Sequence, residues 1–246
     1  QEQNFLAWLS LVETLPRKLF SENDALILED YCEHELNGLV LHHESYWQLM
    51  PLLKNACLLS LLKSKPKELR SFTLSLSQRF LTIKDIKSAI ILLLQIDEKE
   101  KAVEYLSQMG GMLEWIKHGL TNLIELNNLF SQEDAKQYEP IAWLACIVNY
   151  KLGNVSQSRQ IVNLYWQKQQ VNQLAWITAD AMIKLHEGLI FEPKHLEQLT
   201  HFAKNDAQIG PFTGALINNL LAVAFLQTGE NDCAYSAIKQ AKRFYH

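Results

Sequence analysis

The chain has 246 residues, of which 48% are hydrophobic and 20% are charged, and its formal net charge is −4. This composition is ordinary for a globular protein with a substantial core, and the acidic balance excludes a global basic field that would attract nucleic acid. No apolar run approaches the ~18 residues that a membrane-spanning helix needs, so no membrane partner is expected.

The cysteines and the start of the chain bear on its cellular context. The four cysteines are widely separated, and three of them lie among apolar residues of predicted helices. This spacing indicates reduced thiols in a cytoplasmic protein rather than a disulfide framework. The chain begins with Gln and has no signal-peptide pattern, so we expect part of a longer cytoplasmic protein, with processing as the alternative.

The first 64 residues have the order of a winged-helix module. Apolar periodicity predicts helices over Asn4–Leu15 and Asp24–Leu36, separated by a proline. A short hairpin is then predicted, pairing Leu39–Leu41 with Tyr46-Trp47, and a third helix over Leu49–Lys63. Helix, helix, hairpin, helix is the winged-helix order, although the hairpin segment is also compatible with a plain loop between helices.

From Lys67 onward the chain is predicted to consist of helix pairs. Turn glycines fall at Gly119, Gly153, Gly188 and Gly229, with spacings of 34, 35 and 41 residues. A period near 34 built from two helices is the signature of the tetratricopeptide repeat (TPR). The alternative is a generic helical bundle with helices of similar length. Composition places the boundary at Ser64–Lys67, which gives a winged-helix-like module over residues 1–64 and a TPR-like domain over residues 65–246.

The clearest helix pair lies in the segment Glu139–Gln170. Its first helix is predicted over Pro140–Leu152 and its second over Val155–Gln169, with Gly153-Asn154 between them. One such pair cannot bury its own apolar stripe, so neighbouring pairs stack into a superhelix with a concave face. The predicted fold class is therefore mainly α, a TPR-like antiparallel helix-pair superhelix preceded by a small winged-helix-like module.

The concave face of such a superhelix is lined mainly by the first helix of each pair, and it is the candidate binding groove. Side chains from three first helices are predicted to line it: Trp143, Ile147, Tyr150 and Lys151, then Thr178, Met182 and His186, then Asn219, Val223 and Gln227. This mixed aromatic and polar lining suits a protein partner or a small-molecule effector. The alternative for any one of these residues is core packing or ordinary surface.

The sequence contains no pattern of catalytic residues. It has no Gly-rich phosphate loop, no G-x-S-x-G elbow and no H-E-x-x-H motif. His34, His42, His43 and Glu44 lie near Cys32, but their spacing matches no zinc site. We therefore expect no enzymatic activity, no metal and no cofactor in this segment.

Six segments follow one another in a family-like order: Tyr46–Leu53, Leu69–Ser77, Asp85–Ile90, Asp97–Leu106, Met112–Leu120 and Pro140–Gly153. In this order they resemble MalT-like ATP-dependent transcriptional regulators, which combine a signal-transducing NTPase of the STAND class with a LuxR-type DNA-binding domain. Met50 stands where that family usually has His.

The resemblance implies that the chain is the middle of such a regulator, between the NTPase and the DNA-binding domain. Its winged helix would then not read DNA, and its repeats would receive an effector or an inhibitory partner and help to assemble oligomers. We expect a non-catalytic sensor and protein-interaction segment of a bacterial transcriptional regulator, with possible self-association and no direct binding of nucleic acid. Two alternative functions remain. One is a plain TPR scaffold without an NTPase. The other is direct DNA binding by residues 1–64, and the net negative charge argues against that one.

Overall fold

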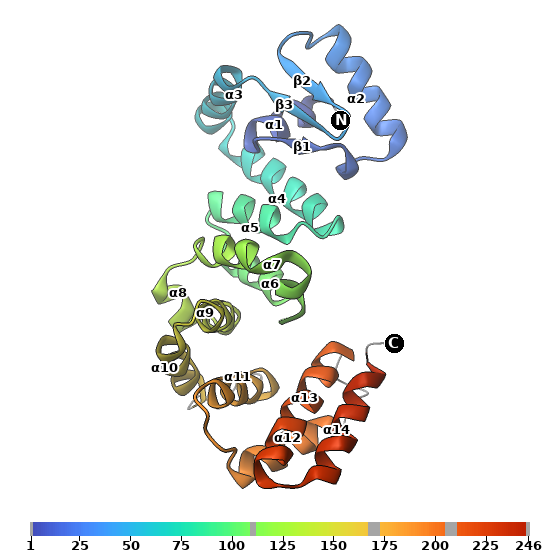
Figure 1. Ribbon diagram of the computed structural model, residues 1–246. Helices are drawn as coiled ribbons and strands as arrows, with labels where there is room; N and C mark the ends of the chain where they lie inside the picture. The colour runs from blue at the N-terminus through green and yellow to red at the C-terminus, as the bar shows by residue number, and fades with distance from the viewer. Residues whose placement is uncertain (1, 109–111, 167–172, 205–210, 245–246) are drawn as a thin grey trace. The chain divides into compact units, whose positions relative to one another are not determined.

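The computed structural model describes residues 2–108, 112–166, 173–204 and 211–244 (Figure 1). The chain divides into two compact units, Gln1–Leu106 and Ser107–His246, and each is described by itself. Within the described residues, no helix is long and apolar enough to span a bilayer.

The first unit begins with a small module of helices and a three-stranded antiparallel sheet in the order β1-β3-β2. The predicted hairpin is confirmed, and its turn is tighter than expected because the strands reach His43 on one side and Tyr46 on the other. The elements are α1 (Glu2–Leu11), β1 (Leu15–Pro16), the short 3-10 helix η1 (Arg17–Leu19), α2 (Glu22–His34), β2 (Val40–His43), β3 (Tyr46–Leu49) and α3 (Pro51–Ser64).

Two predicted helix boundaries in this module are wrong, because sheet pairing takes the residues concerned. Helix α1 ends at Leu11, since Leu15 pairs with Trp47 in the sheet. Pro16 has no N–H to donate and therefore tolerates its place on the edge strand. Helix α3 begins at Pro51, since Leu49 pairs with Val40.

An aromatic core joins the helices and the sheet of this module. Trp47 is fully buried, and the rings of Phe5 and Phe20 each meet it edge-on at 5.5 Å between centroids. Edge-to-face geometry is favourable for aromatic pairs because the ring edge is positive and the face negative. This core contains side chains from α1, from the segment before α2 and from β3, so it holds the module together.

Three further helices complete the first unit: α4 (Pro66–Thr82), α5 (Ile86–Gln95) and α6 (Lys99–Ser107). Helix α1 packs against α4, and Trp8 Nε1 donates a hydrogen bond to the carbonyl of Phe72 at 3.2 Å. The Arg79 guanidinium lies 4.8 Å from the centre of the Trp8 ring and donates to the carbonyl of Leu19. The module of residues 1–64 thus packs on the first helices that follow it. The boundary at Ser64–Lys67, drawn on composition, stays a prediction.

The second unit consists of antiparallel helices that follow one another as TPR-like pairs. Helices α9 and α10, α11 and α12, and α13 and α14 pack as pairs, and α11 also packs on both α9 and α10 (Figure 1). The elements are α7 (Met112–Asn127), α8 (Gln132–Gln137), α9 (Glu139–Lys151), α10 (Val155–Trp166), α11 (Gln173–His186), α12 (Pro193–Lys204), α13 (Pro211–Thr228) and α14 (Asn231–Arg243).

The predicted turn glycines have the backbone conformation that such turns require. Gly153 and Gly229 have φ values of +82° and +78°, which L-residues with a side chain rarely adopt. Gly119 also has a positive φ and non-helical backbone angles, and it marks the kink in α7 at which two helical segments meet. The predicted helix over Val155–Gln169 is confirmed to Trp166, and its last three residues lie outside the described residues.

The predicted fold class is confirmed: the chain is mainly α, with TPR-like antiparallel helix pairs preceded by a small winged-helix-like module.

The α9–α10 pair shows why small residues matter where two helices of a pair are in contact. Ala142 and Cys146 are buried, and Ser158 donates a hydrogen bond to the carbonyl of Cys146 at 2.9 Å. A small side chain at each point lets the two backbones approach closely enough for that bond.

Candidate functional site

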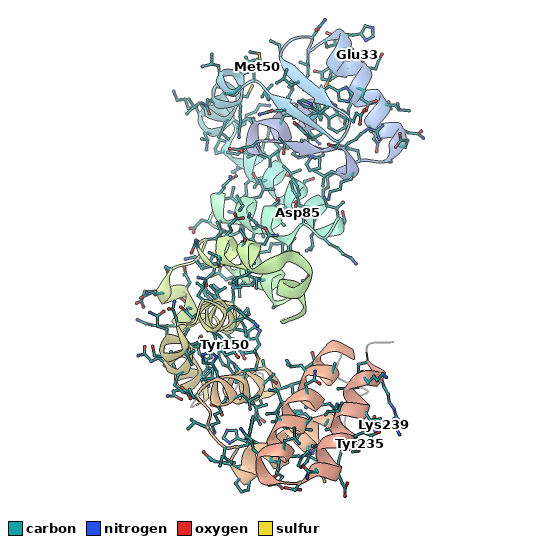
Figure 2. All side chains as sticks on the ribbon, viewed as in Figure 1. Glu33, Met50, Asp85, Tyr150, Tyr235 and Lys239 are labelled. Carbon is teal, nitrogen blue, oxygen red and sulfur yellow. The ribbon has the colours of Figure 1, made fainter. Side chains whose placement is uncertain are left out.

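The C-terminal ends of α9 and α11 bring together three of the predicted groove residues. The ring of Tyr150 meets the ring of His186 edge-on, with centroids 5.8 Å apart. The ammonium group of Lys151 lies 5.5 Å from the centre of the Tyr150 ring. Tyr150 and Lys151 are half-buried, and His186 is exposed (Figure 2 labels Tyr150). We call Tyr150, Lys151 and His186 the α9–α11 cluster.

Partial burial sets the electrostatic character of this cluster. It raises the pKa of the Tyr150 phenol, so the hydroxyl stays protonated at neutral pH and can donate a hydrogen bond. It lowers the pKa of Lys151, because the charged form loses hydration. A phenol, an ammonium group and an imidazole on one face can bind an acidic or aromatic group of a ligand.

Four other predicted lining residues belong to α9 and α11 and are buried or partly buried. Trp143 meets the buried Trp176 edge-on at 5.5 Å. Ile147 is 4% exposed, and Thr178 is 3% exposed with its hydroxyl donating to the carbonyl of Leu174 in its own helix. Met182 is half-buried against the core between α11 and α13. Ile147 and Thr178 therefore belong to the core, whereas Trp143 and Met182 pack against it and stay partly exposed.

The remaining predicted lining residues lie on α13. Asn219, Val223 and Gln227 are exposed, and their spacing places them along one side of that helix. Gln227 donates through its amide nitrogen to the carbonyl of Leu189 at 3.3 Å, which links α13 to the segment before α12. These three residues form an exposed strip of two amides and one valine on α13, in addition to the α9–α11 cluster in the same unit.

Sequence reasoning missed a buried ionic network that joins three helices of the second unit. Asp180 of α11 lies at its centre, with a side chain that is 8% exposed. It accepts a hydrogen bond from Arg159 of α10, and it lies 2.8 Å from His195 Nε2 of α12 and 3.3 Å from Lys184 Nζ. Arg159 also pairs with Glu187. Buried charges persist only when they are paired, and here each cation has a carboxylate.

The network links the second helix of one pair to both helices of the next pair. Burial lowers the pKa of His195, and the neighbouring Lys184 charge acts in the same direction, so its ring favours the neutral form. The signal in the sequence was a carboxylate within Trp176–Ile183, a run whose other residues are apolar except Thr178. This placement indicates a buried charge that needs partners, but the sequence does not say where they lie.

The histidines of the first unit lie on its surface. His42 is 3.4 Å from Glu29, and His34 is 3.2 Å from Asp30. The ring of His43 packs on Tyr46 at 4.4 Å. In the part of the chain that the structure describes, no three His, Cys, Asp or Glu side chains are grouped to hold a metal ion.

Comparison with known proteins gives one informative likeness. No protein-family model matches the chain, and no curated protein matches it. Among solved structures, it is similar to a Signal Transduction ATPase with Numerous Domains (STAND) protein with a tetratricopeptide repeat sensor from Pyrococcus horikoshii, with a TM-score of 0.54 and 11% sequence identity. The match covers 99% of this chain and 44% of that one, so the chain spans less than half the length of that protein.

At this identity the likeness shows the fold alone. It agrees with the coarser part of the predicted resemblance, a STAND protein with a TPR-like sensor. The MalT-like and LuxR-type parts of the resemblance stay predictions.

Proposed function

We propose that this chain is the sensor and protein-interaction segment of a STAND-type bacterial transcriptional regulator, and that it binds an effector or a protein partner at the α9–α11 cluster. The observation that carries the proposal is the meeting of Tyr150, Lys151 and His186 from the first helices of two successive TPR-like pairs. The similarity in fold to a STAND protein with a tetratricopeptide repeat sensor supports it.

A ligand at this cluster would act on the arrangement of the helix pairs. Tyr150 and Lys151 belong to α9, whereas His186 belongs to α11. A ligand that contacts both helices favours the arrangement in which these side chains lie at the right distance. Such a ligand shifts the balance between two states of the regulator only by its difference in affinity for them.

The test is a thermal-shift screen of the 246-residue chain against anionic metabolites and acidic peptides, followed by titration of any hit. Tyr150→Ala and Lys151→Glu should each weaken binding by about 10-fold or more, which corresponds to ~1.4 kcal/mol. Trp143 is a poorer choice, because it packs on Trp176 and its replacement would also disturb the core.

Lys194→Glu is the matched control for the titration. It makes the same charge change at an exposed lysine of α12. A ligand that binds the wild-type chain and all three variants with equal affinity would show that the cluster is not the binding site.

A further inference from the structure

The carboxylate of Asp180 contacts three basic side chains through its two oxygens. Arg159 of α10 donates to Oδ1, whereas His195 Nε2 of α12 and Lys184 Nζ of α11 lie 2.8 Å and 3.3 Å from Oδ2. The side chains of Asp180, Lys184 and His195 are 8%, 12% and 11% exposed. The polar contact between α11 and α12 is therefore largely shielded from water.

The ammonium group of Lys184 faces the ring of His195. Its Nζ lies 3.2 Å from Nδ1 and 3.3 Å from Nε2 of the imidazole. A neutral imidazole has one donor and one acceptor nitrogen, so it can donate to Asp180 and accept from Lys184. An imidazolium has two N–H donors and no acceptor, and an ammonium group also has donors alone, so neither can bind the other. The arrangement therefore fits a neutral His195.

Protonation of His195 would place a third positive charge on one buried carboxylate. The other carboxylates nearby compensate poorly, since Glu192 lies 3.8 Å from Nδ1 and is 69% exposed, and Glu187 pairs with Arg159. Helix α13, which also packs on α12, contains no titratable residue. Like charges repel each other more strongly where little water screens them. Protonation of His195 thus weakens the contact between α11 and α12.

The pKa of His195 is consistent with a neutral ring. Burial lowers it below the ordinary value for histidine, and the Lys184 charge acts in the same direction, against the opposite effects of Asp180 and Glu192. As the pH falls, a ring released from the contact therefore binds a proton before the packed ring does. The contribution of His195 to the packing is complete above about pH 6.5 and is lost as the pH falls toward the lowered pKa.

We propose that Asp180, Lys184 and His195 form a proton-sensitive clasp, which holds α12 on α11 while His195 is neutral and loosens α12 when His195 takes up a proton. Histidine suits this role because it is the side chain whose ordinary titration lies between about pH 5 and 8. The clasp makes the packing of one TPR-like pair responsive to pH. It includes no residue of the α9–α11 cluster, so the proposal does not depend on the proposed function.

Hydrogen exchange of the backbone amides of α12, followed by mass spectrometry on the 246-residue chain, tests the clasp. Exchange is compared at about pH 7.5 and about pH 5.5, after correction for the intrinsic effect of pH on amide exchange. In the wild-type chain the corrected rate for α12 should rise by about 3-fold or more at the lower pH, while that for α9 and α10 changes less.

His195→Gln is the decisive variant, because a glutamine amide offers a donor and an acceptor but takes up no proton in this range. Its corrected exchange in α12 should not depend on pH. Lys184→Met removes the ammonium group beside the ring, so the acid-induced rise should be smaller. His201→Gln is the matched control, since it makes the same substitution at an exposed histidine of α12 and should behave as the wild-type chain does.

Three outcomes would overturn the proposal. The first is a corrected rate for α12 that does not change with pH in the wild-type chain. The second is an acid-induced rise in His195→Gln as large as that in the wild-type chain. The third is a full rise in Lys184→Met, since repulsion by the ammonium group would then not be the cause. Circular dichroism checks that the variants fold, and Lys184→Met decides the question if His195→Gln does not.

Discussion

Asp180 is the residue on which the ionic network of the second unit depends. Its carboxylate is shared by Arg159, Lys184 and His195, which come from three different helices. Arg159 and Lys184 have second carboxylates in Glu187 and Glu192, but the latter is largely exposed. Removal of the Asp180 charge therefore leaves the buried ammonium group of Lys184 as the least compensated cation.

Asp180→Asn should lower the free energy of unfolding by about 3 kcal/mol, because breaking one side of a buried ion pair leaves uncompensated charge. Urea unfolding followed by circular dichroism measures the change. Glu192→Gln serves as the control, since Glu192 is 69% exposed and its loss should cost less than about 1 kcal/mol. Equal stability of the Asp180→Asn and wild-type chains would mean that the network contributes nothing net.

At the scale of elements, the contact between α13 and α14 depends on a glycine within a helix. Gly214 is buried in α13, and a Cβ atom there would meet the Phe244 ring at 2.7, 3.0 and 3.1 Å. Glycine inside a helix costs about 1 kcal/mol relative to alanine. The close approach of Phe244, at the end of α14, explains why a residue with poor helix propensity is present.

Two effects of opposite sign compete in Gly214→Ala, and we expect the steric effect to win. Helix propensity alone would stabilise the chain by about 1 kcal/mol, whereas overpacking against an aromatic ring costs about 1–3 kcal/mol. Chemical unfolding should show net destabilisation. In a Phe244→Leu background the same change should become neutral or stabilising, and a double-mutant cycle measures this coupling. If the free-energy changes of Gly214→Ala and Phe244→Leu are additive, the destabilisation by Gly214→Ala does not arise from the contact with Phe244.

At the scale of the molecule, the first compact unit extends past the boundary that composition suggests. Trp8 of α1 donates to Phe72 of α4, and Arg79 of α4 binds the carbonyl of Leu19. The Arg79 guanidinium also covers the rings of Trp8 and Phe20. The winged-helix-like module therefore relies on α4 to complete its packing.

A fragment of residues 1–106 should unfold in one cooperative thermal transition, while a fragment of residues 1–64 should melt at a lower temperature or without cooperativity. The shorter fragment lacks α4, so it loses these hydrogen bonds and exposes the apolar surface that α4 covers. Circular dichroism at rising temperature compares the two. If residues 1–64 melt at the same temperature as residues 1–106, the module is complete without α4.

Local features of this fold were predictable because they depend on neighbours in the sequence. Apolar spacing identified the helices, and the glycines that end them take the positive φ that their lack of a side chain permits. The hairpin pattern also predicted strands β2 and β3, but it did not predict β1. The two wrong boundaries, at Leu15 and Leu49, arose where pairing across the sheet decided the structure instead.

The candidate sites were only partly predictable, because burial depends on which helix packs where. Tyr150 and His186 were both proposed as groove residues, but only the packing of α11 on α9 brings their rings together. Ile147 and Thr178 fitted the same helical pattern and are buried.

Sequence by itself determined that this chain is mainly helical, and it favoured helix pairs preceded by a small module with a hairpin. Tertiary structure alone decided the partners of Asp180 and the burial of His195. The physical reason is that backbone preferences are set by adjacent residues, whereas the environment of a side chain is set by elements far away in the sequence.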